Sequence, residues 1–228
     1  MIEMQDVWKV YPNGTPALNG ISVKIDKGEF VYVVGPSGAG KSTFIKLMYR
    51  ETRPTKGHIF VNGFNIERLK NRKVPLLRRN IGVVFQDFKL LPKLSAYDNV
   101  AFALEVIGSP HRHMKRRVSE ALSWVGLEEK MHMLPSQLSG GEQQRVAVAR
   151  SLVNNPAVII ADEPTGNLDP DTSWDIMKLF QRINDRGTTI VMATHNREIV
   201  NTLRKRVIAI ERGQIVRDES KGTYGYED

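Results

Sequence analysis

The chain has 228 residues, of which 41% are hydrophobic and 25% charged, the composition of a globular protein with one domain or one domain and a small insertion. It contains no cysteine, which excludes disulfide bonds. No apolar run approaches the ~20 residues of a membrane-spanning helix, and the first ten residues, MIEMQDVWKV, lack the apolar core of a secretory signal. We therefore expect any role at a membrane to be peripheral.

The positive charge is concentrated in one segment. The chain has 33 Lys and Arg against 25 Asp and Glu, a formal net charge of +8. Residues 65–117 contain 12 Lys and Arg but only 4 Asp and Glu, so this segment holds the whole excess. A basic protein suggests a nucleic-acid ligand, and the location of the charge decides whether that suggestion is reasonable.

Short apolar, β-rich runs alternate with helical patterns along the chain. Strands are predicted at 30–34, 158–161, 189–194 and 207–210, and helices at 41–50, 171–185 and 197–205. Short apolar runs separated by helices favour a parallel sheet covered on both faces. Two more strand signals, at 59–62 and 81–85, are predicted to be additions to the first half. Residues 96–152 contain mainly helical patterns, such as 118–125, which indicates a helical insertion in an α/β core.

The strongest motif is a glycine-rich sequence between a predicted strand and a predicted helix. It comprises Gly35, Pro36, Ser37, Gly38, Ala39, Gly40, Lys41, Ser42 and Thr43. The spacing matches G-x-x-x-x-G-K-[ST], a phosphate-binding P-loop. Its glycines let backbone N–H groups turn toward an anion, and the helix start adds the positive end of its dipole. Lys41 can neutralise phosphate oxygens, and the Ser42 hydroxyl can bind Mg²⁺.

Two adjacent carboxylates follow the predicted strand at 158–161. In a parallel sheet, ligands bind at the edge formed by the carboxyl ends of the strands. Asp162 would hold Mg²⁺ through its water shell, and Glu163 would polarise an attacking water. Alone, this pair is equally consistent with an acidic loop after a core strand. Together with the P-loop, it predicts a site of nucleotide hydrolysis.

A third motif lies at the start of a predicted helix, in residues 138–145, LSGGEQQR. Ser139 and Glu142 have the spacing of a capping box, which predicts a well-defined helix start. The capping box does not explain Gly140 and Gly141. Two glycines beside the cap leave backbone N–H groups uncovered, which predicts a second anion site.

These motifs resemble the ABC-type ATPases, whose signature LSGGQ corresponds to residues 138–142. The resemblance covers nearly the whole chain. Gln86 matches the Q-loop, Asp169 ends the D-loop sequence GNLD, His195 matches the switch histidine, and Tyr11 matches the aromatic residue that stacks on adenine. Each of these four matches is weak alone, but their shared order makes the set specific.

The resemblance implies the ABC ATPase fold. This α/β fold has a RecA-like P-loop NTPase core with a mostly parallel sheet, antiparallel β additions at the N-terminus and an inserted helical subdomain. We expect one domain over residues 1–228, with residues 1–90 and 155–228 forming the nucleotide-binding core and residues 91–154 forming the helical subdomain.

The resemblance also implies ATP and Mg²⁺ as cofactors. The residues expected to act in catalysis are Lys41, Gln86, Glu163 and His195. The residues expected to bind the metal are Ser42, Gln86 and Asp162. Tyr11, the P-loop and His195 are expected to contact the nucleotide.

A homodimer would complete the nucleotide sites, because the family signature of one protomer caps the ATP of the other. In this arrangement Ser139 and Gly141 contact the γ-phosphate in trans, Gly140 and Glu142 belong to the same signature, and Asp169 aligns the interface.

The sequence DEPTGNLD at 162–169 resembles the subgroup of lipoprotein-release, macrolide-export and cell-division ATPases, and departs from the S-A-L-D form of many importers. Residues 73–91 most resemble the cell-division branch. This resemblance implies an integral membrane partner, a location on the inner face of the cell membrane at the division site, and signalling rather than transport. Asn196 departs from the Asp that commonly follows the switch histidine.

Several alternatives stay open or are weakened. A lipoprotein or macrolide exporter would differ only in its partner. A nucleic-acid-associated ATPase is disfavoured, because those relatives carry coiled coils or large domains that 228 residues do not accommodate. Nucleotide binding without hydrolysis is disfavoured by Glu163.

Two surfaces are candidates for contact with the membrane partner. Phe88, Leu90 and Leu91 follow the Q-loop glutamine and are predicted either to line a docking groove or to pack inside the helical insertion. A basic face is predicted either to support docking close to the membrane or to be simply solvated. Its residues are Arg68, Lys70, Arg72, Lys73, Arg112, Lys115, Arg116 and Arg117.

Overall fold

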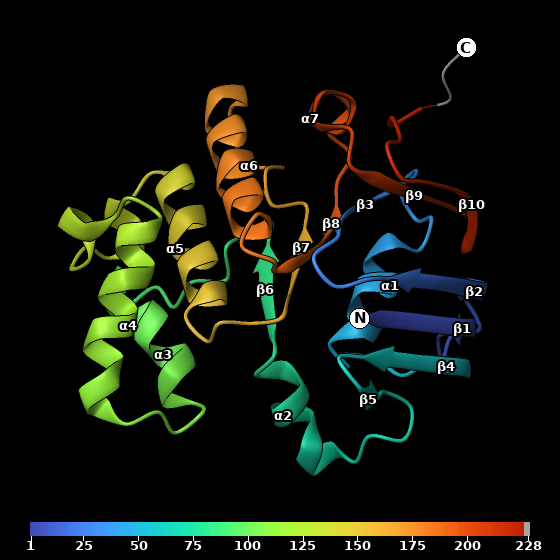
Figure 1. The fold of residues 1–228 in the computed structure, drawn as a ribbon, viewed down its shortest axis with the longest axis horizontal. Coiled ribbons are helices and arrows are strands. Elements are labelled where there is room, and N and C mark those ends of the chain that lie inside the picture. The colour runs from blue at the N-terminus through green and yellow to red at the C-terminus, as the bar shows by residue number, and fades with distance from the viewer. Residues whose placement is uncertain (226–228) are drawn as a thin grey trace.

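A computed structural model describes residues 1–225, and its core is a six-stranded sheet in the order β10-β9-β3-β8-β7-β6 (Figure 1). The strands from β9 to β6 are parallel, and β10 pairs antiparallel with β9. Their bounds are Phe30–Val34 (β3), Ile81–Phe85 (β6), Val158–Asp162 (β7), Thr189–Ala193 (β8), Arg206–Glu211 (β9) and Gln214–Glu219 (β10). The four predicted core strands match β3, β7, β8 and β9 to within one residue at each end.

Strand β6 corrects one expectation. Residues 81–85 were predicted to be an addition to the first half, but β6 pairs in parallel with β7 and forms the edge of the core sheet. The pairing brings Phe85 opposite Asp162. The order of strands in a sheet depends on crossover connections, so position in the chain did not predict this neighbour. As a result, the segment after β6 begins beside the carboxylates that follow β7.

A second, antiparallel sheet has the order β2-β1-β4-β5. Its strands are Ile2–Val10 (β1), Pro16–Ile25 (β2), Lys56–Val61 (β4) and Phe64–Asn65 (β5). In β2, Ile21, Val23 and Ile25 are buried while Ser22 and Lys24 between them are exposed, the alternation of a half-buried strand. This sheet supplies the expected antiparallel addition at the N-terminus.

Helix α1 (Lys41–Met48) joins the two sheets. Its buried side chains, among them Phe44 and Ile45, belong to a hydrophobic cluster that also contains Ile2 of β1 and Val31 of β3. The helix that follows the glycine-rich loop is therefore fixed by packing on both sides.

Helices cover the other face of the core sheet. Helices α3 (Ala96–Glu105), α4 (His111–Trp124) and α5 (Gly140–Leu152) form a group on the left of Figure 1, with short 3₁₀ turns at Glu128–Lys130 and Pro135–Gln137. This group confirms a helical insertion, while the subdomain boundaries at residues 91 and 154 stay a prediction. The remaining helices are α2 (Val74–Arg78), preceded by a 3₁₀ turn at Asn71–Lys73, α6 (Pro170–Asn184) and α7 (Arg197–Leu203).

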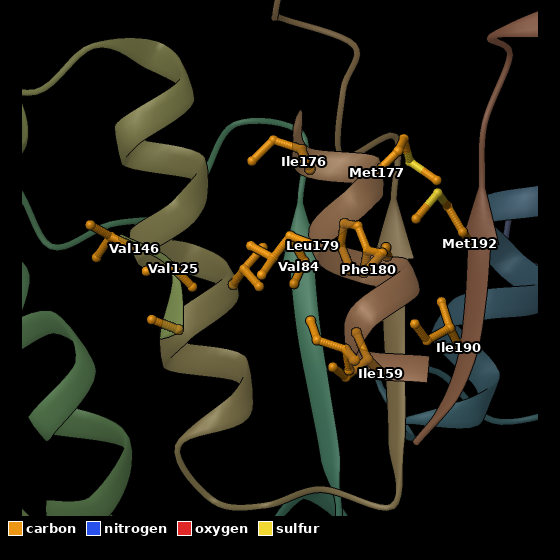
Figure 2. Packing of buried hydrophobic residues seen from close by; sticks show 14 of the residues in the cluster. Val84, Val125, Val146, Ile159, Ile176, Met177, Leu179, Phe180, Ile190 and Met192 are labelled. Atoms are coloured by element: carbon orange, nitrogen blue, oxygen red, sulfur yellow. The ribbon is translucent and has the colours of Figure 1, made fainter. Parts of the chain in front are cut away.

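Helix α6 lies between the helical group and the core sheet. Figure 2 shows Phe180 and Leu179 of α6 close to Val84 and Ile159 of the strands, with Val146 of α5 on the other side. All of these side chains are at most 5% exposed. One continuous apolar core therefore connects the signature helix α5 to the strands that carry the site.

The predicted basic face is largely exposed, with one exception. Arg117 is half-buried, and its guanidinium donates a hydrogen bond of 2.6 Å to the Val153 carbonyl beyond α5. Its inclusion in the face was therefore wrong, because this side chain ties two helices together. Among residues 1–225, no helix is long and apolar enough to cross a membrane.

Candidate functional site

The glycine-rich loop connects β3 to α1 and passes very close to other backbone. Gly35 (φ 142°) and Gly40 (φ 111°) have dihedral angles that other residues rarely adopt. A Cβ on Gly35 would collide with the Ile210 carbonyl, and a Cβ on Gly40 with the Ala17 carbonyl. Because Gly40 is the N-cap of α1 and has no side chain, no side chain caps the first N–H groups of this helix.

Lys41, the first residue of α1, reaches back to this loop. Its ammonium group donates hydrogen bonds to the carbonyls of Gly35 (2.8 Å) and Pro36 (3.0 Å). The Tyr11 hydroxyl lies 3.1 Å from the hydroxyl of Thr43 in α1, and the ammonium of Lys9 lies 5.0 Å from the Tyr11 ring centre. The loop thus combines unblocked N–H groups, a cation and a nearby aromatic ring.

Asp162 is the last residue of β7, and its carboxylate lies beside Ser42 at the start of α1. Burial raises the pKa of the Asp162 carboxyl, and the neighbouring negative charge of Glu163 raises it further. Lys46, a hydrogen bond from the Ser42 hydroxyl and Lys41 oppose this rise of the pKa. The structure therefore brings together the hydroxyl and the carboxylate that the sequence assigned to a metal.

Glu163 and His195 are joined across the ends of β7 and β8. Oε2 of Glu163 lies 2.8 Å from Nδ1 of His195 and accepts a hydrogen bond of 3.1 Å from the His195 backbone N–H. Glu163 has a left-handed backbone (φ 51°), held by a hydrogen bond from its N–H to the Ala193 carbonyl. The two side chains line a pocket of about 210 Å³ together with D-loop residues such as Gly166.

The Gln86 side chain contacts the D-loop. Its Nε2 donates to Oδ1 of Asn167 (3.0 Å), and Nδ2 of Asn167 donates back to the Gln86 carbonyl (3.1 Å). A Cβ on Gly166 would lie 2.8 Å from Gln86 Nε2, so the glycine provides room for the glutamine. No hydrogen bond joins Gln86 to Asp162 or Ser42 in the described residues, and its role at the metal stays a prediction.

The signature forms the predicted capping box at the start of α5. The Ser139 hydroxyl accepts from the Glu142 N–H (3.2 Å), and the Glu142 carboxylate accepts from the Ser139 N–H (2.9 Å). Lys130 lies 2.5 Å from the same carboxylate. The hydrogen bonds from Lys130 and from the Ser139 N–H lower the pKa of Glu142.

The two signature glycines differ. A Cβ on Gly141 would collide with the Thr172 side chain of α6, so this glycine is required by helix packing. Gly140 has only ordinary contacts, with the nearest side chain Leu168 at 3.5 Å from a Cβ. Asp169, at the end of the D-loop, caps α6 by accepting a hydrogen bond from the Thr172 N–H (2.9 Å). Packing therefore explains one of the two glycines, while the N–H groups of both remain outside the capping box.

The sequence did not single out the side chains that connect α5 to the site. Gln144 is completely buried, and its Nε2 donates to the carbonyls of Pro164 (2.5 Å) and Phe85 (3.4 Å). Arg150 donates to the carbonyls of Phe88 (2.8 Å) and Lys89 (2.6 Å), just after Gln86. Gln144 lies within the sequence LSGGEQQR at 138–145 and Asn167 within GNLD, so both residues belong to recognised motifs but were not predicted to make these contacts. Arg150 offered none.

The donor set at the end of β7 fits Mg²⁺. This cation binds oxygen ligands, usually with one or two carboxylates, phosphates and water. Ser42 and Asp162 provide a hydroxyl and a carboxylate, and burial together with the neighbouring charge of Glu163 raises the pKa of Asp162, so a bound cation would stabilise its charged form. The described residues contain no cluster of three or more His, Cys, Asp and Glu, so a metal here would need ligands from phosphates and water.

Comparison with known proteins identifies the class. Residues 18–166 match the ABC transporter family, and the chain belongs to this family. It is therefore an ATP-binding cassette with ATPase activity, and the predicted family and ABC ATPase fold are confirmed.

Similar proteins are named Cell division ATP-binding protein FtsE. The relative from Bacillus subtilis is 67% identical over 100% of both chains. The relative from Mycobacterium tuberculosis is 55% identical over 100% of this chain and 99% of its own. The relative from Escherichia coli K12 is 47% identical over 94% of this chain and 97% of its own.

Solved structures agree with this assignment. A dimeric post-hydrolysis state of the ATP-binding cassette MJ0796 bound to ADP and Pi has a TM-score of 0.87 and 36% identity, and it covers 99% of this chain and 100% of its own. A second dimeric structure of MJ0796 has the same TM-score, 37% identity and the same coverage.

Proposed function

We propose that this protein is the ATP-hydrolysing subunit of a bacterial cell-division complex, which signals through the integral membrane protein FtsX to control peptidoglycan hydrolases. The observation that carries the proposal is the joined Glu163–His195 pair beside Asp162, at the sheet edge that also holds the P-loop. Identity of 47–67% over 94–100% of the chain with proteins named FtsE supports the assignment to cell division.

The nucleotide binds at the P-loop. The N–H groups of Ser37, Gly38 and Gly40 in the loop and those at the start of α1 surround the phosphates, and Tyr11 lies where an adenine ring can stack. Lys41 exchanges its two carbonyl partners for phosphate oxygens. Ser42, Asp162 and Gln86 would hold Mg²⁺, which would neutralise charge on the phosphate oxygens.

Glu163 acts on the attacking water. Its Oε2 contacts both Nδ1 and the backbone N–H of His195. The other carboxylate oxygen has no hydrogen-bond partner among the described residues and can orient water. The left-handed backbone at Glu163 and the short contact with His195 fix the direction of the carboxylate. His195 is largely exposed, with 64% of its side chain accessible, so it can reach the γ-phosphate while it positions Glu163.

Hydrolysis requires a second copy of the chain. The signature N–H groups of Gly140 and Gly141 lie at the start of α5, and the Ser139 hydroxyl can still donate, because the capping box uses it only as an acceptor. In a head-to-tail homodimer, Ser139 and Gly141 contact the γ-phosphate of the partner protomer, and the exposed Asp169 lies at the interface. The dimeric structures of MJ0796 support this arrangement.

FtsX is proposed to dock beside the Q-loop on the inner face of the membrane at the division site. Leu91 is 37% exposed, whereas Leu90 packs against the main hydrophobic core and Phe88 is half-buried. Leu91 is therefore the best candidate for direct contact, and Leu90 contributes by supporting the loop.

Isolation of the complex from membranes tests this proposal. Affinity-tagged protein is purified from detergent-solubilised membranes of the source organism, and the co-purifying integral protein is identified by mass spectrometry. We expect FtsX. Leu91→Glu should reduce its recovery, while Leu134→Glu, at a similarly exposed apolar residue, should not. Recovery of a lipoprotein-release or macrolide-export permease in its place contradicts the proposal.

A further inference from the structure

A basic projection lies between the two sheets and the helical group. Residues 66–79, here called the basic knob, follow β5 and include α2. Ile66, Leu69 and Leu77 are at most 8% exposed and anchor the knob in the core that surrounds α1. No Asp or Glu occurs between residues 68 and 86. The knob therefore presents concentrated positive charge from a fixed backbone.

Most cations of the knob make no ion pair within residues 1–225. Arg78 differs from the others, because it donates to the carbonyls of Tyr49 and Arg50. The exposed cations that make no ion pair with any described residue are Arg68, Lys70, Arg72, Lys73 and Arg79. Among them, Leu76 is 44% exposed, although it is a large apolar side chain. Leu76 is close in sequence to Lys73 and Arg79, so the knob combines an exposed apolar side chain with cations that make no ion pair.

A second basic site lies along the same edge of the molecule. Figure 1 shows α2 and the turn between α3 and α4 both projecting from the lower edge. At this turn, Val106 is 66% exposed, and Arg112 and Lys115 follow as exposed cations at the start of α4. Arg116 is also exposed and contacts Glu120 at 3.4 Å, a weak surface pair. Two separate elements thus repeat the same combination of an exposed apolar side chain and nearby cations.

We propose that this edge is a binding surface for an anionic lipid bilayer. Lys and Arg attract the negatively charged headgroups, while Leu76 and Val106 enter the interfacial region and are removed from water. A nucleic acid would satisfy the cations through its phosphates but would gain little from exposed leucine and valine. The two projections also suit an extended surface better than a groove. The inference does not depend on FtsX, because it requires only lipid.

Vesicle sedimentation with the purified full-length protein tests this proposal. The vesicles contain either phosphatidylglycerol mixed with phosphatidylcholine or phosphatidylcholine alone. Lys70→Glu/Lys73→Glu is compared with Lys27→Glu/Lys221→Glu, a matched double variant that changes net charge equally at exposed lysines outside residues 65–117. Because each well-placed cation contributes about fivefold to binding, the partition coefficient on anionic vesicles should fall at least ~25-fold in the first variant. It should fall no more than about twofold in the second.

Leu76→Ser separates lipid insertion from charge alone. It leaves every cation in place and should weaken binding to anionic vesicles by about threefold or more. All variants should keep the wild-type melting temperature and basal ATPase rate, since none of these residues lies at the nucleotide site. The proposal is overturned if the wild type binds neutral and anionic vesicles equally, or if the two double variants lose binding to anionic vesicles equally. Tighter binding to duplex DNA than to anionic vesicles at the same salt concentration also overturns it and assigns the surface to nucleic acid.

Discussion

Gln86 and Asn167 hold each other by two hydrogen bonds in opposite directions, one of 3.0 Å from the glutamine side chain and one of 3.1 Å to its backbone carbonyl. The Q-loop therefore depends on the D-loop of the same chain for its orientation. The D-loop ends at Asp169, the proposed dimer contact, so this pair provides a physical connection between the proposed interface and the glutamine that is proposed to bind the metal.

The first prediction is that Gln86 and Asn167 act as a unit. Asn167→Ala should lower kcat by about fivefold, because it removes both hydrogen bonds, with little change in the KM for ATP. Gln86→Ala should have an effect at least as large. In the double variant the two losses of kcat should not add. A double-mutant cycle built from the steady-state rates of the four proteins should give a coupling energy of about 1 kcal/mol between Gln86 and Asn167. Fully additive effects would show that the two residues act separately.

The second prediction concerns the turn after Gln86. Phe88 and Lys89 both have left-handed backbones (φ 60° and 49°), a conformation that costs about 1–2 kcal/mol per residue. Arg150 donates a hydrogen bond to each carbonyl, and burial lowers the pKa of its guanidinium. Arg150→Met should therefore destabilise the protein by about 2–4 kcal/mol in denaturant unfolding and lower kcat.

Glycine at position 89 supplies the control for this prediction. Lys89→Gly removes the backbone cost of the left-handed conformation, so it should restore about 1 kcal/mol of stability and part of the kcat to Arg150→Met. Lys89→Ala removes the same side chain but keeps that cost, so it should restore neither. If both substitutions rescue equally, the left-handed turn is not what Arg150 supports.

Local patterns predicted the parts of the site that lie within one stretch of chain. The P-loop, the Asp162–Glu163 pair and the Ser139–Glu142 capping box each combine a strand or helix end with adjacent polar residues. Strand β6 was misplaced, because its pairing with β7 joins residues far apart in the chain. The Arg150 contacts span about sixty residues and arise only from helix packing.

The N-terminal strands show a different limit. The apolar alternation of β1 is interrupted between Met4 and Val7, where the pairing with β2 shifts and Asp6 adopts a left-handed backbone. A bulge of this kind breaks the period of two from which strands are predicted. The antiparallel addition was consequently expected from family resemblance, while the residues of β1 and β2 were not assigned from the sequence.

The third prediction separates ATP binding from hydrolysis. Glu163→Gln should keep ATP binding and lower kcat by about 10²–10⁴-fold, because it removes the group proposed to activate water, and ATP-bound dimer should accumulate in size-exclusion chromatography. Lys41→Ala should lose ATP binding in a fluorescent-nucleotide titration. Glu198→Gln is the matched control, since this exposed acid lines the same pocket and should retain the wild-type rate. A wild-type rate in Glu163→Gln would rule out its role as the base.

The fourth prediction concerns the negative charge of Asp162. Its raised pKa means that folding favours the protonated form, so the contribution of this group to stability is present at low pH and is lost as pH rises through the folded-state pKa. At neutral pH the buried charge therefore destabilises the protein. Asp162→Asn should raise the nucleotide-free melting temperature by ~2–4 °C, corresponding to about 1 kcal/mol.

The same substitution should remove the effect of the metal. In the wild type, Mg²⁺ with ATP should raise the melting temperature more than ATP alone, whereas Asp162→Asn should show no difference between the two. Asp26→Asn, at an exposed aspartate paired with Lys24, controls for charge removal and should change neither quantity appreciably. An unchanged Mg²⁺ effect in Asp162→Asn would exclude this carboxylate from the metal site.

The fifth prediction is a pH dependence at the signature helix. Lys130 and the Ser139 N–H hold the pKa of Glu142 below its ordinary value of 4.5. A lowered folded-state pKa contributes stability that is complete above the unfolded value and is lost as pH falls through the folded value. Glu142→Gln should therefore be less stable than the wild type at pH 7, and this difference in stability should disappear in acid.

Lys130→Met should shift the acid transition to higher pH, whereas Lys178→Met, at an exposed lysine paired with Asp175, should leave it unchanged. Unfolding followed by circular dichroism across this pH range checks the prediction. If the lower stability of Glu142→Gln persists below the folded-state pKa, the charge of Glu142 does not stabilise the helix start.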